Sequence, residues 1–94
     1  MPDLETRRYI VSGRVQGVGF RWFVEREAAL IGVTGWVRNS QDGNVEVMAT
    51  GTREQHITLR RKLQAGPRAA RVDQVLESLA PLLEAKSFQI EGVW

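Results

Sequence analysis

The sequence predicts an α+β fold in which two helices pack on one face of a mostly antiparallel sheet. Three observations lead to this prediction. Apolar residues recur at helical spacing in two stretches, and they alternate with polar residues or form short β-prone runs in several others. The chain has 94 residues, of which 43% are hydrophobic, so there is room for one domain, and all the elements must share one core.

The first strand and the first helix are separated by a glycine-rich turn. Residues 8–14 include Tyr9-Ile10-Val11, a β-prone run that predicts a strand. From Phe20 onward, the apolar residues Phe20, Val24, Ala28 and Ile31 are three or four positions apart, which predicts one buried stripe on a helix. Gly32 is a suitable end for that helix, because glycine readily adopts the left-handed conformation of a C-terminal cap.

The second half predicts a hairpin, a helix and further strands. Residues 35–39 and 44–50 flank an Asp-Gly pair in the turn 40–43, which favours a β-hairpin. Residues 52–55 have the form of a capping box, and Gly66-Pro67 ends the helix. The remaining strand candidates are 70–79 and 87–93, separated by an irregular stretch around Pro81. The order β-α-β-β-α-β predicts the ferredoxin-like sandwich, a fold that hosts too many functions to identify one.

Composition excludes several classes of protein. There is no cysteine, which excludes disulfides, a thiolate nucleophile and a Cys-ligated zinc site. The single histidine, His56, gives no metal site, so we interpret it as structural and expect neither metal nor cofactor. Net charge is +2 without a basic block, which argues against nucleic acid. No run of 18 apolar residues occurs, so we expect a cytoplasmic protein that binds no membrane. We also expect residues 1–94 to form one domain, with residues 1–6 as a flexible tail.

The turn before the first helix has the composition of an anion site. Gly13, Gly17 and Gly19 fall within seven residues, a costly arrangement unless backbone freedom is needed. A loop of this kind, with the unpaired N–H groups and positive dipole of the helix that follows, can hold an anion, and Arg21 can grip two phosphate oxygens. The sequence matches neither a Walker loop nor the dinucleotide fingerprint. The predicted phosphate-binding loop consists of Gln16, Gly17, Val18, Gly19 and Phe20.

Two segments resemble one known family. Gly13-Arg14-Val15-Gln16-Gly17-Val18-Gly19-Phe20-Arg21 resembles, at every position, the signature Gly-Arg-Val-Gln-Gly-Val-x-Phe-Arg of the acylphosphatase family. Gly35-Trp36-Val37-Arg38-Asn39 and Asp42-Gly43-Asn44-Val45-Glu46 form a second similar block, and weaker similarity covers nearly the whole chain. The resemblance implies a metal-independent hydrolase that cleaves the carboxyl–phosphate bond of acyl phosphates. It implies that Arg21 binds the phosphate and Asn39 orients the attacking water.

The chemistry of such a substrate is compatible with so few functional groups. The leaving carboxylate has an ordinary pKa of about 4, so it departs at neutral pH without receiving a proton. The tasks that remain are positioning water and stabilising phosphoryl oxygens. We expect a monomer that acts on a small-molecule acyl phosphate and accepts inorganic phosphate or sulfate in the same site.

Alternatives remain at this point. The loop could belong to a phosphate- or anion-binding module without turnover, or to an acylphosphatase-like domain of a larger carbamoyl-transfer enzyme; a chain of one domain starting at Met1 favours the free-standing enzyme. Residues 17–24 superficially resemble an RNA-recognition motif, but that motif requires a strand and the spacing here is helical. We interpret Arg14 and Arg38 as ordinary exposed charges, and Trp22 and Trp36 as core or core-edge residues.

Overall fold

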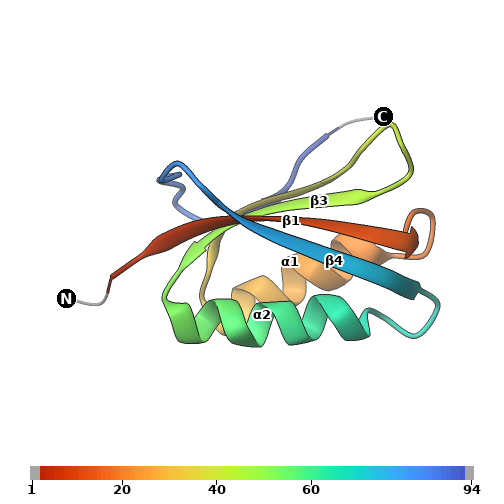
Figure 1. Ribbon diagram of the computed structural model, residues 1–94, viewed down its shortest axis with the longest axis horizontal. Helices are drawn as coiled ribbons and strands as arrows, with labels where there is room; N and C mark the ends of the chain where they lie inside the picture. Colours follow the sequence, from red (N-terminus) through yellow and green to blue (C-terminus); the bar gives the residue numbers. More distant parts are fainter. Residues whose placement is uncertain (1–2, 93–94) are drawn as a thin grey trace.

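Five strands form one sheet, and two helices cover one of its faces (Figure 1). The computed structural model describes residues 3–92. The sheet has the order β4-β1-β3-β2-β5, antiparallel throughout except between β2 and β5. This confirms the predicted ferredoxin-like α+β sandwich. The elements are β1 (Glu5–Arg14), α1 (Phe20–Ile31), β2 (Thr34–Asn39), β3 (Val45–Gly51), α2 (Arg53–Ala65), β4 (Arg71–Ala80) and β5 (Phe88–Ile90).

The first strand begins earlier than the sequence predicts. Residues 5 and 6 belong to β1, so the prediction of a tail over residues 1–6 is wrong for these two positions. The hydroxyl of Thr6 is buried and lies 2.6 Å from the hydroxyl of Thr50. The hydroxyl of Thr50 donates to the Leu83 carbonyl, and the Leu83 N–H donates to the Thr6 hydroxyl. A polar residue can therefore be buried here because every hydroxyl has a partner.

The last strand is shorter than predicted. β5 covers Phe88–Ile90, whereas the sequence predicts residues 87–93. The pairing continues for one residue, because the Glu91 N–H donates to the Val37 carbonyl at 2.8 Å. Residues 1–2 of the predicted tail, residue 93 of the predicted strand and Trp94 lie outside the described residues.

The end of α1 and the start of α2 lie where the sequence predicts their caps. Gly32 adopts a φ of 95° after α1, and its N–H donates to the Ala28 carbonyl. At the start of α2 the Gln55 N–H donates to the Thr52 hydroxyl at 3.2 Å, and the Thr52 N–H donates to the Gln55 side chain at 2.8 Å. This reciprocal pair is the predicted capping box.

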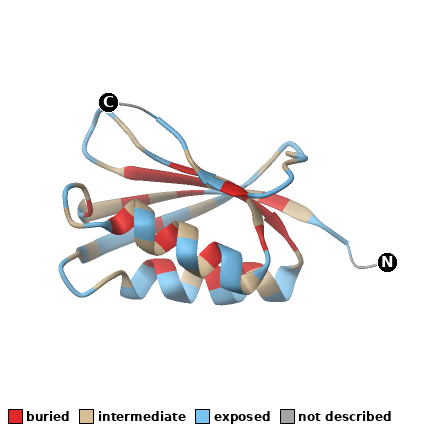
Figure 2. Ribbon diagram, turned by 180° about the vertical axis from the view of Figure 1, so that it is seen from behind, coloured by how far each residue is buried: buried red, intermediate tan, exposed pale blue. Residues whose placement is uncertain are grey.

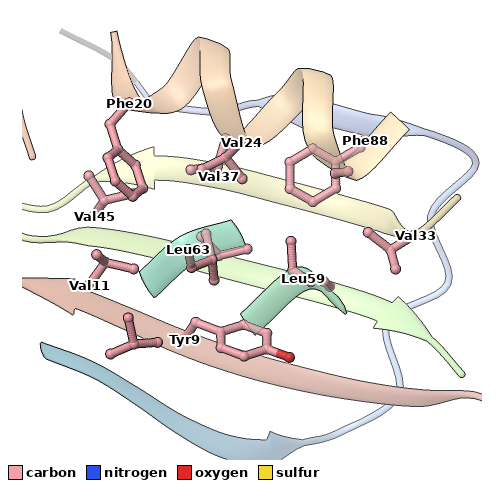
Figure 3. Packing of buried hydrophobic residues seen from close by; sticks show 14 of the residues in the cluster. Tyr9, Val11, Phe20, Val24, Val33, Val37, Val45, Leu59, Leu63 and Phe88 are labelled. Atoms are coloured by element: carbon pink, nitrogen blue, oxygen red, sulfur yellow. The ribbon is translucent and has the colours of Figure 1, made fainter. Parts of the chain in front are cut away.

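The core lies between the helices and the covered face of the sheet. Figure 2 shows buried residues in red where the helices face the strands. The strands contribute alternate residues and the helices one stripe each, in accordance with the two periodicities of the sequence. The labelled side chains of Figure 3 include Tyr9, Val11, Val37 and Val45 from the sheet, and Phe20, Val24, Leu59 and Leu63 from the helices.

His56 is part of this core, as predicted for a structural histidine. Its ring is 1% exposed; Nε2 donates to the Glu5 carbonyl at 2.8 Å, and Nδ1 accepts from the Tyr9 hydroxyl at 2.7 Å. A carbonyl can only accept, so Nε2 carries a proton, and Nδ1 is the acceptor in the neutral form. Burial lowers the pKa of His56 and favours the same neutral form.

The prediction that Trp22 is a core or core-edge residue is wrong. Its side chain is 72% exposed, because it lies on the side of α1 opposite Phe20 and Val24. Trp36 lies on the uncovered face of the sheet, since the next residue along the strand, Val37, faces the helices. The guanidinium of Arg38 lies 4.8 Å from the centre of the Trp36 ring.

Candidate active site

The loop between β1 and α1 uses its glycines in two different ways. Gly17 and Gly19 have φ values of 74° and 77°, and a Cβ added at either position would meet nothing within 4 Å. These two residues are glycines because of their backbone conformation, and their surroundings are open. Gly13 has a φ of 127°, and a Cβ there would lie 2.1 Å from the carbonyl oxygen of Arg71. Gly13 therefore allows β4 to approach β1 closely, next to a shift in the register of the two strands.

The loop and the first turn of α1 present a series of backbone donors. The N-cap residue, Gly19, has no side-chain cap, and the first helical hydrogen bond runs from the Phe23 N–H to the Gly19 carbonyl at 3.1 Å. Within residues 3–92, no protein acceptor pairs with the N–H groups from Gly17 to Trp22. Unpaired donors at the positive end of a helix dipole form a binding site for an anion.

Arg21 adds a fixed positive charge beside these donors. It lies in the first turn of α1, half-buried, and no carboxylate in the described part of the chain lies within ion-pair distance. Phe23 and Pro67 line a common hollow, which marks the flank of α1 that faces the end of α2. Arg21 lies on the opposite flank of the helical stripe, and α1 packs against β2 and β5 there. The arginine is therefore on the side of α1 that faces β2.

Asn39 is the last residue of β2 and pairs with Val45 of β3. Figure 3 shows Phe20, at the start of α1, pointing toward Val45, so the arginine-bearing turn and the asparagine-bearing strand end meet at one end of the sheet. The side-chain oxygen Oδ1 of Asn39 is buried and has no hydrogen-bond partner among the described residues. Buried polar atoms are normally hydrogen-bonded, so this oxygen is available to accept a hydrogen bond from a water or a ligand.

The side chain of Gln16 joins the loop to the β2–β3 turn. Its Nε2 donates to the backbone carbonyls of Ser40 and Asn44, both at 2.8 Å. The turn itself is closed by the Ser40 N–H, which donates to the Asn44 carbonyl at 2.9 Å. Hydrogen bonds from the Ser40 hydroxyl and the Asn44 N–H to the carboxylate of Asp42 lower the pKa of this carboxyl. The sequence places Gln16 in the loop but gives no sign of this contact across 24 and 28 residues.

Arg38 is exposed, as predicted, and it is also part of an ion pair. It lies on the uncovered face of the sheet, and its Nε and Nη2 bind the carboxylate of Glu46 at 2.9 and 2.8 Å. Glu46 also accepts from Arg8. Burial opposes ionisation of Glu46, but the hydrogen bonds from the two arginines outweigh it and hold the pKa of the carboxyl below its usual value. Arg14 is likewise exposed, at the end of β1.

Three further findings bear on the classes of function. Residues 20–24 lie in α1 rather than on a strand, so the resemblance to an RNA-recognition motif is not supported by the fold. In the described part of the chain no three His, Cys, Asp or Glu residues lie close enough together to bind a metal ion. None of the helices in residues 3–92 is long and apolar enough to span a membrane.

The chain is similar to proteins of one family. A family model described as Acylphosphatase matches residues 7–90. An acylphosphatase of Koribacter versatilis (strain Ellin345) is 59% identical over 91 residues, which are 96% of this chain and 83% of the relative. An acylphosphatase structure from Coxiella burnetii superimposes with a TM-score of 0.91 at 34% identity and covers 95% of this chain and 94% of its own.

A much larger protein contains a similar unit. The structure of full-length HypF in its phosphate- and nucleotide-bound form matches with a TM-score of 0.91 at 27% identity, over 98% of this chain and 12% of that one. The relative from Koribacter, in contrast, has 83% of its length in the match. The chain has an open donor loop, an arginine and an asparagine at one end of the sheet. A family model matches almost the whole length of the chain, and the chain therefore belongs to the acylphosphatase family.

Proposed function

We propose that this protein hydrolyses the carboxyl–phosphate bond of acyl phosphates and releases a carboxylate and inorganic phosphate. The loop of residues 16–20 and the guanidinium of Arg21 hold the phosphate, and Asn39 orients the attacking water. The observation that carries the proposal is the meeting of two unsatisfied features at one end of the sheet. These are the unpaired N–H donors from Gly17 to Trp22 and the unpartnered Oδ1 of Asn39.

Each group matches one requirement of phosphoryl transfer. The phosphoryl oxygens carry the negative charge in the transition state, and preorganised N–H donors and a guanidinium stabilise it there. A water that donates a hydrogen to Oδ1 of Asn39 is fixed in orientation, with a lone pair left to attack phosphorus. The departing oxygen belongs to a carboxylate, which leaves without a proton at neutral pH. The leaving group therefore needs no acid from the protein, and the protons of the attacking water remain on the released phosphate, in agreement with the structural role of His56.

The same geometry supports a self-sufficient enzyme. The donor loop, Arg21 and Asn39 all come from one chain, so a monomer is expected to be active on small-molecule acyl phosphates. Inorganic phosphate and sulfate should compete with the substrate, because the donors contact only the oxygen atoms of a tetrahedral anion. The proposed location of the protein is the cytoplasm, as expected from the sequence.

The test is hydrolysis of benzoyl phosphate in the presence of excess chelator. Arg21→Ala should lower kcat/KM by about 10²–10³-fold, the usual loss for one oxyanion donor, and Asn39→Ala by about 10²-fold, the usual cost of a misplaced reacting group. The matched control is Arg26→Ala, which removes an exposed arginine of the same helix and should leave the rate within about twofold. Equal rates for all four proteins would contradict the proposal. Phosphate binding without turnover by the wild type would identify an anion-binding module instead.

A further inference from the structure

The amide of Gln16 is the direct connection between the phosphate loop and the strand end that carries Asn39. Among the described residues, no other hydrogen bond joins residues 15–19 to residues 40–44. Both acceptors, the carbonyls of Ser40 and Asn44, belong to the turn that begins directly after Asn39.

The geometry of this contact is specific to glutamine. A side-chain amide has two N–H bonds, and here each is directed to a different carbonyl at 2.8 Å. Both carbonyls can only accept, so a carboxylate at this position would be repelled and an apolar side chain would leave the connection unmade. Two bonds from one nitrogen also fix the rotation of the amide, which a single bond would not.

We propose that Gln16 is a positioning residue that sets the distance between the bound phosphate and the water held by Asn39. The proposal rests on the proposed function. Phe20 at the start of α1 and Val45 of β3 belong to the same buried core (Figure 3), and Val18 packs against that core, but Gln16, Gly17 and Gly19 are not part of it. The surroundings of Gly17 and Gly19 are open, so on either side of Val18 the loop has no such packing, and the two hydrogen bonds of Gln16 connect it to the β2–β3 turn.

A positioning role has a magnitude that distinguishes it from loss of binding. Displacement of a reacting group by about 1 Å can cost about 10²-fold in rate, while the N–H donors that hold the phosphate stay in place. Removal of the Gln16 amide should therefore lower kcat by about 10–100-fold and leave the inhibition constant of inorganic phosphate within about twofold. A residue that only held the loop in shape would weaken phosphate binding and lower the rate together.

The experiment uses Gln16→Ala and Gln16→Met with benzoyl phosphate as substrate. Gln16→Met keeps the length of the side chain and removes both donors, so a folded variant is available if Gln16→Ala unfolds. The matched control is Gln41→Ala, an exposed glutamine of the adjacent turn with no hydrogen bond from its side chain among the described residues. Thermal unfolding of each variant is measured in the same buffer, and Gln41→Ala should retain the kcat of the wild type.

A double-mutant cycle with Asn39→Ala tests the connection directly. If Gln16 acts through Asn39, adding Gln16→Met to Asn39→Ala should lower kcat by less than twofold. The same fold-loss in both backgrounds would overturn the inference, and so would a matching rise in the inhibition constant of phosphate. The rates of the wild type and Asn39→Ala in the same series decide the proposed function separately. The side-chain amide signals of Asn39 in NMR, which need no turnover, should shift in Gln16→Met and stay in place in Gln41→Ala.

Discussion

Replacement of Asn39 by alanine should remove activity without reducing stability. The buried Oδ1 of Asn39 has no partner within residues 3–92, and such an oxygen destabilises the folded state by about 1–3 kcal/mol. The truncation also removes the packing of the carboxamide, whose single carbon atom is worth roughly 0.8 kcal/mol when it is valued like a buried methylene group. The net change in the free energy of unfolding should therefore lie between about zero and a gain of 2 kcal/mol. For a domain of this size, each kcal/mol corresponds to about 4–8 °C in Tm.

Asn44 provides the matched comparison. It is the asparagine at the other end of the same turn, and its Nδ2 donates to Asp42 at 3.3 Å. Asn44→Ala loses this hydrogen bond and should destabilise the protein by about 0.5–1 kcal/mol. Both variants are unfolded by urea, monitored by tryptophan fluorescence, in phosphate-free buffer, because a bound anion would stabilise the wild type selectively. A loss of more than about 1 kcal/mol in Asn39→Ala would refute the reasoning, since Oδ1 would then be hydrogen-bonded to a tightly held water or another group even without substrate.

Two further predictions concern the glycines and the charged groups next to the core. In urea unfolding, Gly13→Ala should destabilise the protein more than Gly19→Ala, because the new Cβ at position 13 would overlap the Arg71 carbonyl. Gly19→Ala costs only the strain of the left-handed conformation, about 1 kcal/mol. Similar losses of stability in the two variants would be inconsistent with the close approach of β4 to Gly13. Glu77 is held below its usual pKa by Arg7 and Arg60, whose hydrogen bonds outweigh burial. The stabilising contribution of ionised Glu77 should be complete above the ordinary pKa of a glutamate carboxyl and should fall as the pH drops toward the lowered pKa. Glu77→Gln should therefore flatten the dependence of Tm on pH below about pH 5. An unchanged slope of Tm against pH would contradict this.

The parts of the fold that follow local rules could be predicted from the sequence. The stripe beginning at Phe20, the stop at Gly32 and the capping box at Thr52 depend on neighbours within one or two helical turns, and each is found where predicted. The anion loop was predicted on the same basis, because positive φ values at Gly17 and Gly19 are a local property.

The features that could not be predicted depend on contacts between distant residues. Thr6 is buried because Thr50 and Leu83 satisfy its hydroxyl, and neither is near it in the sequence. Trp22 is exposed because the aromatic ring falls on the outer side of the helix, where size alone suggested the core. Gln16 reaches the turn after Asn39 only because β1 and β3 are paired, a register that no local pattern specifies.

The position of β1 between β3 and β4 also has a consequence for how the chain folds. The first strand to be synthesised pairs with β3 along one side and with β4 along the other. Thr6 can therefore pair with Thr50 and Ala80 only after these later residues have been synthesised. Loop closure over such separations costs entropy before any contact repays it, so folding should be slower than in a helical bundle of equal length. On a ribosome that adds about 5–20 residues per second, the N-terminal strand remains without its second neighbour for several seconds. During this interval its unpaired edges are exposed to other nascent chains and to chaperones.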